Sequence, residues 1–301
     1  MRFLLLLFAG LLLASPGWYF ITIQLKYVST IESLFYRFIL AGFLLEIVRR
    51  FSNESPPLQM NLRLWILTST QGILLFGLNF WCIYEASKHM ISGLIPALPA
   101  IIFVPALFIE RFIVQQKIPH IKIWGSAFAL LGIFFLFFHE ITTFDTSHLF
   151  GLMLVFFSIF FTLGGSEVAK HLTQVKKVPI LWLTSRTLLM GGLFFLMIVM
   201  IGPGFSPLPN EGEFFVSLLY LIVFVTCLLY FLHMYMIKNF GVPSASFLWV
   251  LLPSACLFVS TLFEGYVWTT MTTAGLLCII LGAFLFYSQQ MNLKQKLMQI
   301  R

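Results

Sequence analysis

The chain has 301 residues, of which 60% are hydrophobic and only 10% are charged. Soluble domains carry about 25% charged residues, so this composition excludes an ordinary soluble fold. The net charge of +7 does not indicate nucleic acid binding, because the basic residues follow the connections between apolar runs and form no basic patch.

Ten apolar runs of roughly bilayer length follow one another along the chain. A helix that spans a membrane needs roughly 20 apolar residues, and a lone strand in lipid would leave its backbone groups unpaired. The alternating ten-residue segments typical of a barrel are absent. We therefore predict an all-α polytopic membrane protein with ten transmembrane helices, at about 3–23, 28–48, 64–84, 91–110, 121–139, 149–169, 178–201, 213–237, 243–263 and 270–288.

The first run has two interpretations. Arg2, the apolar residues that follow it and the sequence Ala14-Ser15-Pro16-Gly17 are similar to a cleaved signal peptide. However, the apolar character continues to Ile23, which is long enough to span a membrane. Cleavage would also leave nine helices, so we favour the retained helix.

Lysine and arginine predict the orientation of the helices. With the N-terminus in the cytoplasm, Lys26 and Lys88 fall outside, Arg37 and Arg186 lie within spans, and the other fourteen of the eighteen fall inside. Such a bias places both termini on the cytoplasmic side of an inner (plasma) membrane. The inside set is Arg2, Arg49, Arg50, Arg63, Arg111, Lys117, Lys122, Lys170, Lys176, Lys177, Lys238, Lys294, Lys296 and Arg301.

The run from Ser92 to Arg111 returns far downstream, between Ser246 and Glu264. A shift of 154 residues places Pro99 on Pro253 and Glu110 on Glu264. Other residues pair at similar shifts: Arg37 with Arg186 at 149, Gly125 and Gly132 with Gly275 and Gly282 at 150, and Asn79 with His233 at 154. The chain therefore has the pattern of a duplication.

Each half of the duplication contains five predicted helices. Because five is odd, the second half lies upside down in the membrane relative to the first, as in alternating-access transporters with a midplane substrate site. We predict a first repeat over 1–145, a second over 146–290 and a basic cytoplasmic tail over 291–301.

These segments resemble the EamA-type ten-helix exporters of the drug/metabolite transporter superfamily. The residues that carry the resemblance are Trp18, Arg37-Phe38, Tyr84-Glu85-Ala86, Ser92–Glu110, Trp124-Gly125 to Gly132, Pro243–Glu264 and Gly275 to Gly282. The resemblance implies a secondary transporter of a small-molecule substrate, with export and amino acids favoured. Members also carry purines, cations, sugars and lipid-linked groups, so the resemblance does not fix the substrate.

Two arginines lie deep within predicted spans. Arg37 is nine residues from the outer start of its run, about 13 Å at 1.5 Å per residue, and Arg186 lies at a similar depth from the inner face. A guanidinium there costs about 3 kcal/mol or more and normally faces a cavity or the bundle interior. In the functional interpretation each arginine binds substrate or gates the pathway. In the structural interpretation it donates hydrogen bonds to carbonyls of neighbouring helices. The sequence leaves both interpretations open.

Further candidates lie in helices expected near the centre. Asn79 and His233 can bind substrate or hold helices together, and for His233 a satisfied core histidine is the simpler interpretation. Trp18, Tyr84 and Trp249 are candidates for a stacking surface, against the alternative of an aromatic belt. Pro96, Pro99 and Pro253 predict helix kinks that serve gating or merely fit the packing.

Enzyme, metal and cofactor sites find no support in the motifs. His139-Glu140 is followed by Thr143 where a zinc protease needs histidine, and Gly164-Gly165-Ser166 does not complete GxSxG. The four cysteines show no paired spacing. We expect no cofactor and no metal, a lipid bilayer environment and either a monomer or a homodimer. A channel, a helper subunit and an embedded enzyme remain alternatives. No carboxylate is predicted at mid-span, so uniport or exchange is as plausible as proton coupling.

Overall fold

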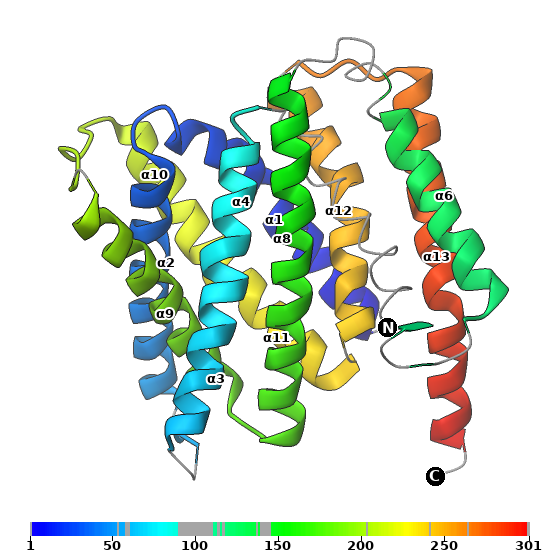
Figure 1. Ribbon diagram of the computed structural model, residues 1–301, viewed down its shortest axis with the longest axis horizontal. Coiled ribbons are helices and arrows are strands. Elements are labelled where there is room, and N and C mark those ends of the chain that lie inside the picture. The colour runs from blue at the N-terminus through cyan, green and yellow to red at the C-terminus, as the bar shows by residue number, and fades with distance from the viewer. Residues whose placement is uncertain are drawn as a thin grey trace.

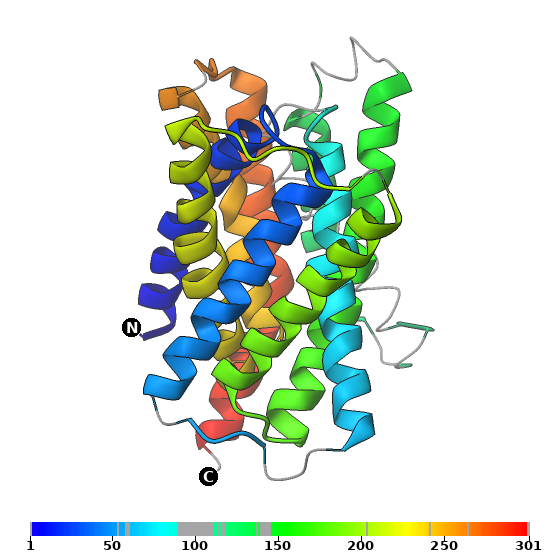
Figure 2. The ribbon, with the colours of Figure 1, turned by 90° about the vertical axis from the view of Figure 1, so that its left-hand side faces the viewer.

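A computed structural model describes residues 2–52, 54–57, 61–89, 111–112, 115, 118–136, 138, 146–202, 204–240, 242–263 and 265–299. Within these ranges the chain forms helices and connections, without a strand. The helices run side by side as one bundle (Figure 1), and the view turned by 90° shows the same arrangement (Figure 2). The predicted fourth span, with Pro96, Pro99 and Glu110, lies outside the described residues.

Nine of the predicted runs correspond to continuous helical segments in the described part of the chain. Two of them contain π-helical stretches in their interior, η1 and η5. The segments are α1 (Arg2–Gln24), α2 (Thr30–Phe51), α3 (Leu62–Gly72) with η1 (Ile73–Leu78) and α4 (Asn79–Ala86), α6 (His120–Leu136), α8 (Thr146–Lys170) with η4 (His171–Val175), α9 (Ile180–Ile201), α10 (Gly212–Tyr220) with η5 (Leu221–Leu228) and α11 (Leu229–Phe240), α12 (Val242–Phe263) and α13 (Thr270–Gln299).

Five of these segments are long and apolar enough to cross a membrane, which makes the protein a multi-pass membrane protein. They are Phe3–Gln24, Leu62–Ala86, Leu149–Val175, Ile180–Ile201 and Gly212–Phe240. The largest departure from the predicted boundaries is in α13, which continues as a helix to Gln299 through most of the predicted tail.

Polar side chains at the loops determine where several helices begin. Ser29 and Glu32 form a capping box at the start of α2, and the side chain of Asn61 accepts a hydrogen bond from Leu64 N at the start of α3. Glu54, in the connection after α2, accepts from Trp182 N at 2.9 Å near the start of α9. The α2–α3 connection is therefore tied to the first turn of α9.

Helices α2 and α9 pack closely because each has a glycine where it contacts the other, Gly42 on α2 and Gly192 on α9. A Cβ built on Gly42 would lie 2.7 Å from Leu189 Cγ, and one built on Gly192 would lie 2.7 Å from Ile39 Cδ1. Residue 192 is 42 plus 150 and residue 189 is 39 plus 150, so a shift of 150 residues exchanges the two contacts. In each helix, the glycine therefore packs against an aliphatic side chain of the other helix in an equivalent way.

Helices α6 and α13 pack in the same way at one side of the bundle (Figure 1). A Cβ on Gly125 would meet Gly282 O at 2.7 Å, and a Cβ on Gly132 would meet Gly275 O at 2.5 Å. A shift of 150 residues again exchanges the two contacts. The interior π-helical stretches η1 and η5 end at residues 78 and 228, which are also 150 residues apart.

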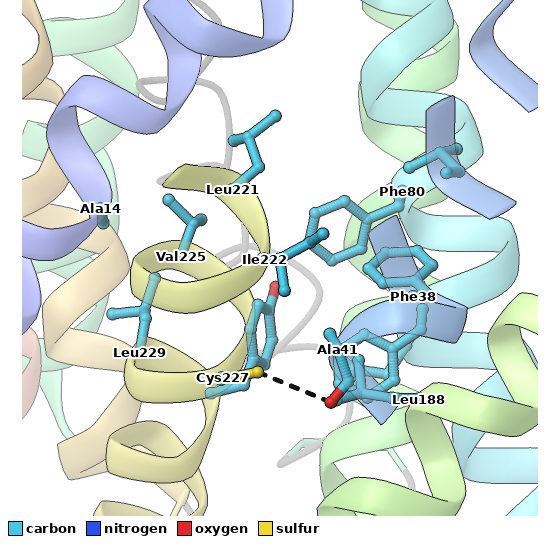
Figure 3. Packing of buried hydrophobic residues seen from close by; sticks show 14 of the residues in the cluster. Ala14, Phe38, Ala41, Phe80, Leu188, Leu221, Ile222, Val225, Cys227 and Leu229 are labelled. Atoms are coloured by element: carbon cyan, nitrogen blue, oxygen red, sulfur yellow. Dashed lines mark hydrogen bonds between the residues drawn. The ribbon is translucent and has the colours of Figure 1, made fainter. Parts of the chain in front are cut away.

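The main core lies where α2, α4 and η5 meet. Figure 3 shows Phe38 and Phe80 on one side of this region and Ile222 and Val225 on the other, with Cys227 Sγ donating to Ala41 O at 3.6 Å. Phe38 is fully buried, and its ring centroid lies 5.1 Å from that of Phe80. The ring of Phe80 also lines the site described next.

Candidate functional site

A cavity of about 90 Å³ lies among the central helices, with room for several water molecules. It is bordered by both halves of the chain: α1, α2, η1 and α4 from the first, and α8, η5, α11 and α12 from the second. Most of its lining is apolar or aromatic, as is typical of sites for organic ligands. Five predicted site residues are among those that line it, namely Trp18, Arg37, Asn79, His233 and Trp249.

Arg37 is fully buried and is held on three sides by uncharged groups. Its Nε donates to Thr226 Oγ1 at 2.6 Å and its Nη1 donates to the hydroxyl of Tyr84 at 2.9 Å. Its guanidinium carbon lies 5.0 Å from the ring centroid of Phe80, within cation–π range. The third nitrogen, Nη2, is buried and has no hydrogen-bond partner.

The η5 segment explains why Thr226 can accept from Arg37. The hydroxyl of Thr226 donates its single hydrogen to Leu221 O at 2.7 Å, five residues earlier in the π-helix. With that hydrogen committed, the oxygen presents only lone pairs to Arg37 Nε. Interruptions of this kind in an α-helix are frequent at functional sites.

Asn79 and His233 each present one unpaired polar atom. Asn79 Nδ2 donates to Leu75 O at 3.2 Å, which leaves the buried Oδ1 without a partner. His233 Nε2 accepts from Trp249 Nε1 at 3.1 Å, which assigns the imidazole proton to Nδ1. That Nδ1 is also buried and unpaired. The site thus offers one charged donor, one neutral donor and one acceptor.

Three other predicted residues in the described part of the chain, Tyr84, Arg186 and Pro253, are not among the residues that line the cavity. Tyr84 is buried behind Arg37, to which it is hydrogen-bonded. Arg186 Nη2 instead forms an ion pair with Glu46 Oε2 at 3.1 Å, which connects α9 to α2. Helix α12 continues through Pro253, which has no N–H to donate to the carbonyl of Trp249.

Comparison with known proteins places the chain in a family. Residues 1–138 and 149–288 both match the EamA-like transporter family. The chain belongs to the EamA-like transporter family. As members of this family are transporters rather than enzymes, the protein is a membrane transporter of small molecules.

Solved structures confirm the fold of this EamA-like transporter. The crystal structure of another protein aligns with this chain with a TM-score of 0.68 at 14% sequence identity. The alignment covers 95% of this chain and 96% of that chain. This likeness concerns the fold alone. No curated protein matches the chain.

Sequence reasoning missed several polar groups at the cavity. Ser158, Thr162 and Ser166 line it from α8, and Thr226 on η5 accepts a hydrogen bond from Arg37. The α8 residues recur every four positions, which places them on one face of a helix. This polar stripe within an apolar run is the signal that could have identified them.

Proposed function

We propose that this EamA-like transporter is a secondary carrier that exports small organic metabolites, with amino acids favoured, by alternating access at the Arg37 cavity. The observation that carries the proposal is a cavity lined by both halves of the chain, in which three of the lining residues each have a buried polar atom without a hydrogen-bond partner. Export and amino acids rest on the family resemblance alone.

Alternating access in this proposal uses two inverted repeats, 1–145 and 146–290. Two observations support this arrangement: the family matches the chain twice, and the α2–α9 and α6–α13 contacts recur at an offset of 150 residues. Equivalent helices that pack antiparallel with reciprocal contacts are expected of repeats related by a two-fold axis in the membrane plane.

The proposal assigns a role to each candidate residue. Arg37, Asn79 and His233 bind the polar groups of the substrate, and Trp18 and Trp249 stack on its apolar part. Tyr84 positions Arg37. Arg186 gates the inner side through its ion pair with Glu46, and Pro253, with Pro96 and Pro99, supplies bends that allow helices to move.

Counterflow into liposomes that contain the purified protein tests this function. The panel is labelled amino acids, nucleobases and organic cations, with and without a pH gradient. Saturable counterflow of one class is expected, and Trp249→Ala is expected to reduce it because Trp249 lines the cavity. Trp124→Ala is the matched control, since that side chain on α6 is 64% exposed. Absence of flux for every class in a folded protein would contradict the proposal.

A further inference from the structure

The cavity contains a permanent positive charge whose partners are all uncharged. The guanidinium of arginine is positively charged, and the contacts of Arg37 are two hydroxyls and aromatic rings. We infer that the cavity takes a ligand with a carboxylate group, and that this carboxylate binds Arg37 Nη2. The inference rests on the proposed transport function and specifies its substrate class.

No carboxylate of the described residues serves as a counter-ion for Arg37. These acidic side chains lie near helix ends or in connections: Glu32, Glu46, Glu54, Glu85, Glu167, Glu211 and Glu213. Glu32, five residues before Arg37 on α2, accepts hydrogen bonds from Ser29 and Ser206, and Glu46 is engaged by Arg49 and Arg186. A buried charge without a counter-ion carries a desolvation cost of several kcal/mol, which an anionic ligand would offset.

The geometry also limits the charge and the binding mode of the ligand. Nε donates its one hydrogen to Thr226 and Nη1 donates one of its two hydrogens to Tyr84, so Nη2 is the nitrogen without a hydrogen-bond partner. The engaged Nε excludes the side-on fork in which Nε and Nη2 together clamp a phosphate. A single positive charge compensates one negative charge, so a monoanionic carboxylate fits better than a dianionic phosphate.

The remaining lining describes the rest of the ligand. Trp18, Tyr230 and Trp249 offer aromatic surfaces to an apolar body, and Asn79 Oδ1 can accept a hydrogen bond from an N–H or O–H group. An organic cation without a carboxylate would instead be repelled by Arg37. The site therefore selects for the carboxylate first and for the apolar body second.

Three compounds that share one phenylethyl body separate these contributions. 3-Phenylpropanoate carries only the carboxylate, 2-phenylethylamine only the ammonium, and phenylalanine carries both. Binding to the purified full-length protein is measured by tryptophan fluorescence, since Trp18 and Trp249 line the cavity, and by ligand-induced thermal stabilisation. The two carboxylates are expected to bind at least tenfold more tightly than the amine.

Substitution at Arg37 tests the assignment. Arg37→Gln is expected to weaken carboxylate binding about tenfold or more and to abolish the preference over the amine, while Arg37→Lys keeps part of it. Arg63→Gln, which removes the same charge from an exposed position at the start of α3, is expected to keep the preference. If Arg37→Gln does not fold, Arg37→Lys alone decides the outcome, because a preference identical to wild type would contradict the inference.

Other outcomes distinguish the inference from the proposed function. Equal binding of the amine and the carboxylates, or no binding of any of the three, would overturn the carboxylate site. Saturable counterflow of a solute without a carboxylate would also overturn it while leaving the carrier intact. Carboxylate binding that depends on Arg37, without counterflow, would support the site and refute the carrier.

Discussion

The contact between α6 and α13 yields a sharp prediction about stability. In Gly282→Ala the new Cβ would lie 2.5 Å from Gly125 O and 2.6 Å from Ala129 N. Close C–H···O contacts in proteins lie at about 3.3–3.6 Å, so the helices must separate by about 0.8 Å. Both obstructing atoms belong to the backbone, and no side-chain rotation can relieve the clash.

The magnitude follows from two opposing contributions. Overpacking of a tight contact costs about 1–3 kcal/mol, whereas replacing glycine by alanine within a helix returns about 1 kcal/mol. We expect Gly282→Ala to lower the free energy of unfolding by up to about 2 kcal/mol, which corresponds to a decrease in Tm of up to roughly 8 °C.

Thermal unfolding in detergent, followed by tryptophan fluorescence, measures this effect. Gly164→Ala on α8 is the matched control, because its new Cβ would meet only Leu74 Cδ1, at an ordinary contact distance of 3.4 Å. The control is expected to keep or slightly raise Tm. The reasoning is refuted if Gly282→Ala unfolds at the same temperature as Gly164→Ala, since the α6–α13 contact would then not be close.

Three further predictions concern the site and the ends of the bundle. A double-mutant cycle of Glu46→Gln and Arg186→Gln should yield a coupling of about 1 kcal/mol in the free energy of unfolding, because the pair is partly exposed; additive effects would show that the pair is not formed. Trp249→Phe removes the donor to His233 and should lower the free energy of unfolding by about 1 kcal/mol, as measured by thermal unfolding; an unchanged Tm would contradict that bond. Pro253→Ala restores a helical N–H and should slow counterflow in liposomes without weakening ligand binding; an unchanged rate would exclude a gating role.

The composition and spacing of apolar runs were sufficient to predict the all-helical membrane fold, and the family was predicted from the resemblance of particular motifs such as Tyr84-Glu85-Ala86. Each of the nine comparable runs needed only length and hydropathy, which are local properties of the chain. The π-helical stretch η5 and the hydrogen bond that Arg37 donates to Thr226 could not be predicted, since the bond depends on how η5 packs against α2. The polar face of α8 was present in the sequence as a four-residue spacing and was overlooked.

The two membrane arginines show how much depends on a single residue of register. The sequence alignment paired Arg37 with Arg186 at a shift of 149, whereas the reciprocal packing of α2 and α9 gives 150 and aligns Arg37 with Thr187. One residue corresponds to a rotation of about 100° around a helix. Arg37 therefore lines the cavity, while Arg186 turns toward Glu46. Equivalence of residue type in the two halves does not imply equivalence of role, because the packing of glycines determines which face each arginine occupies.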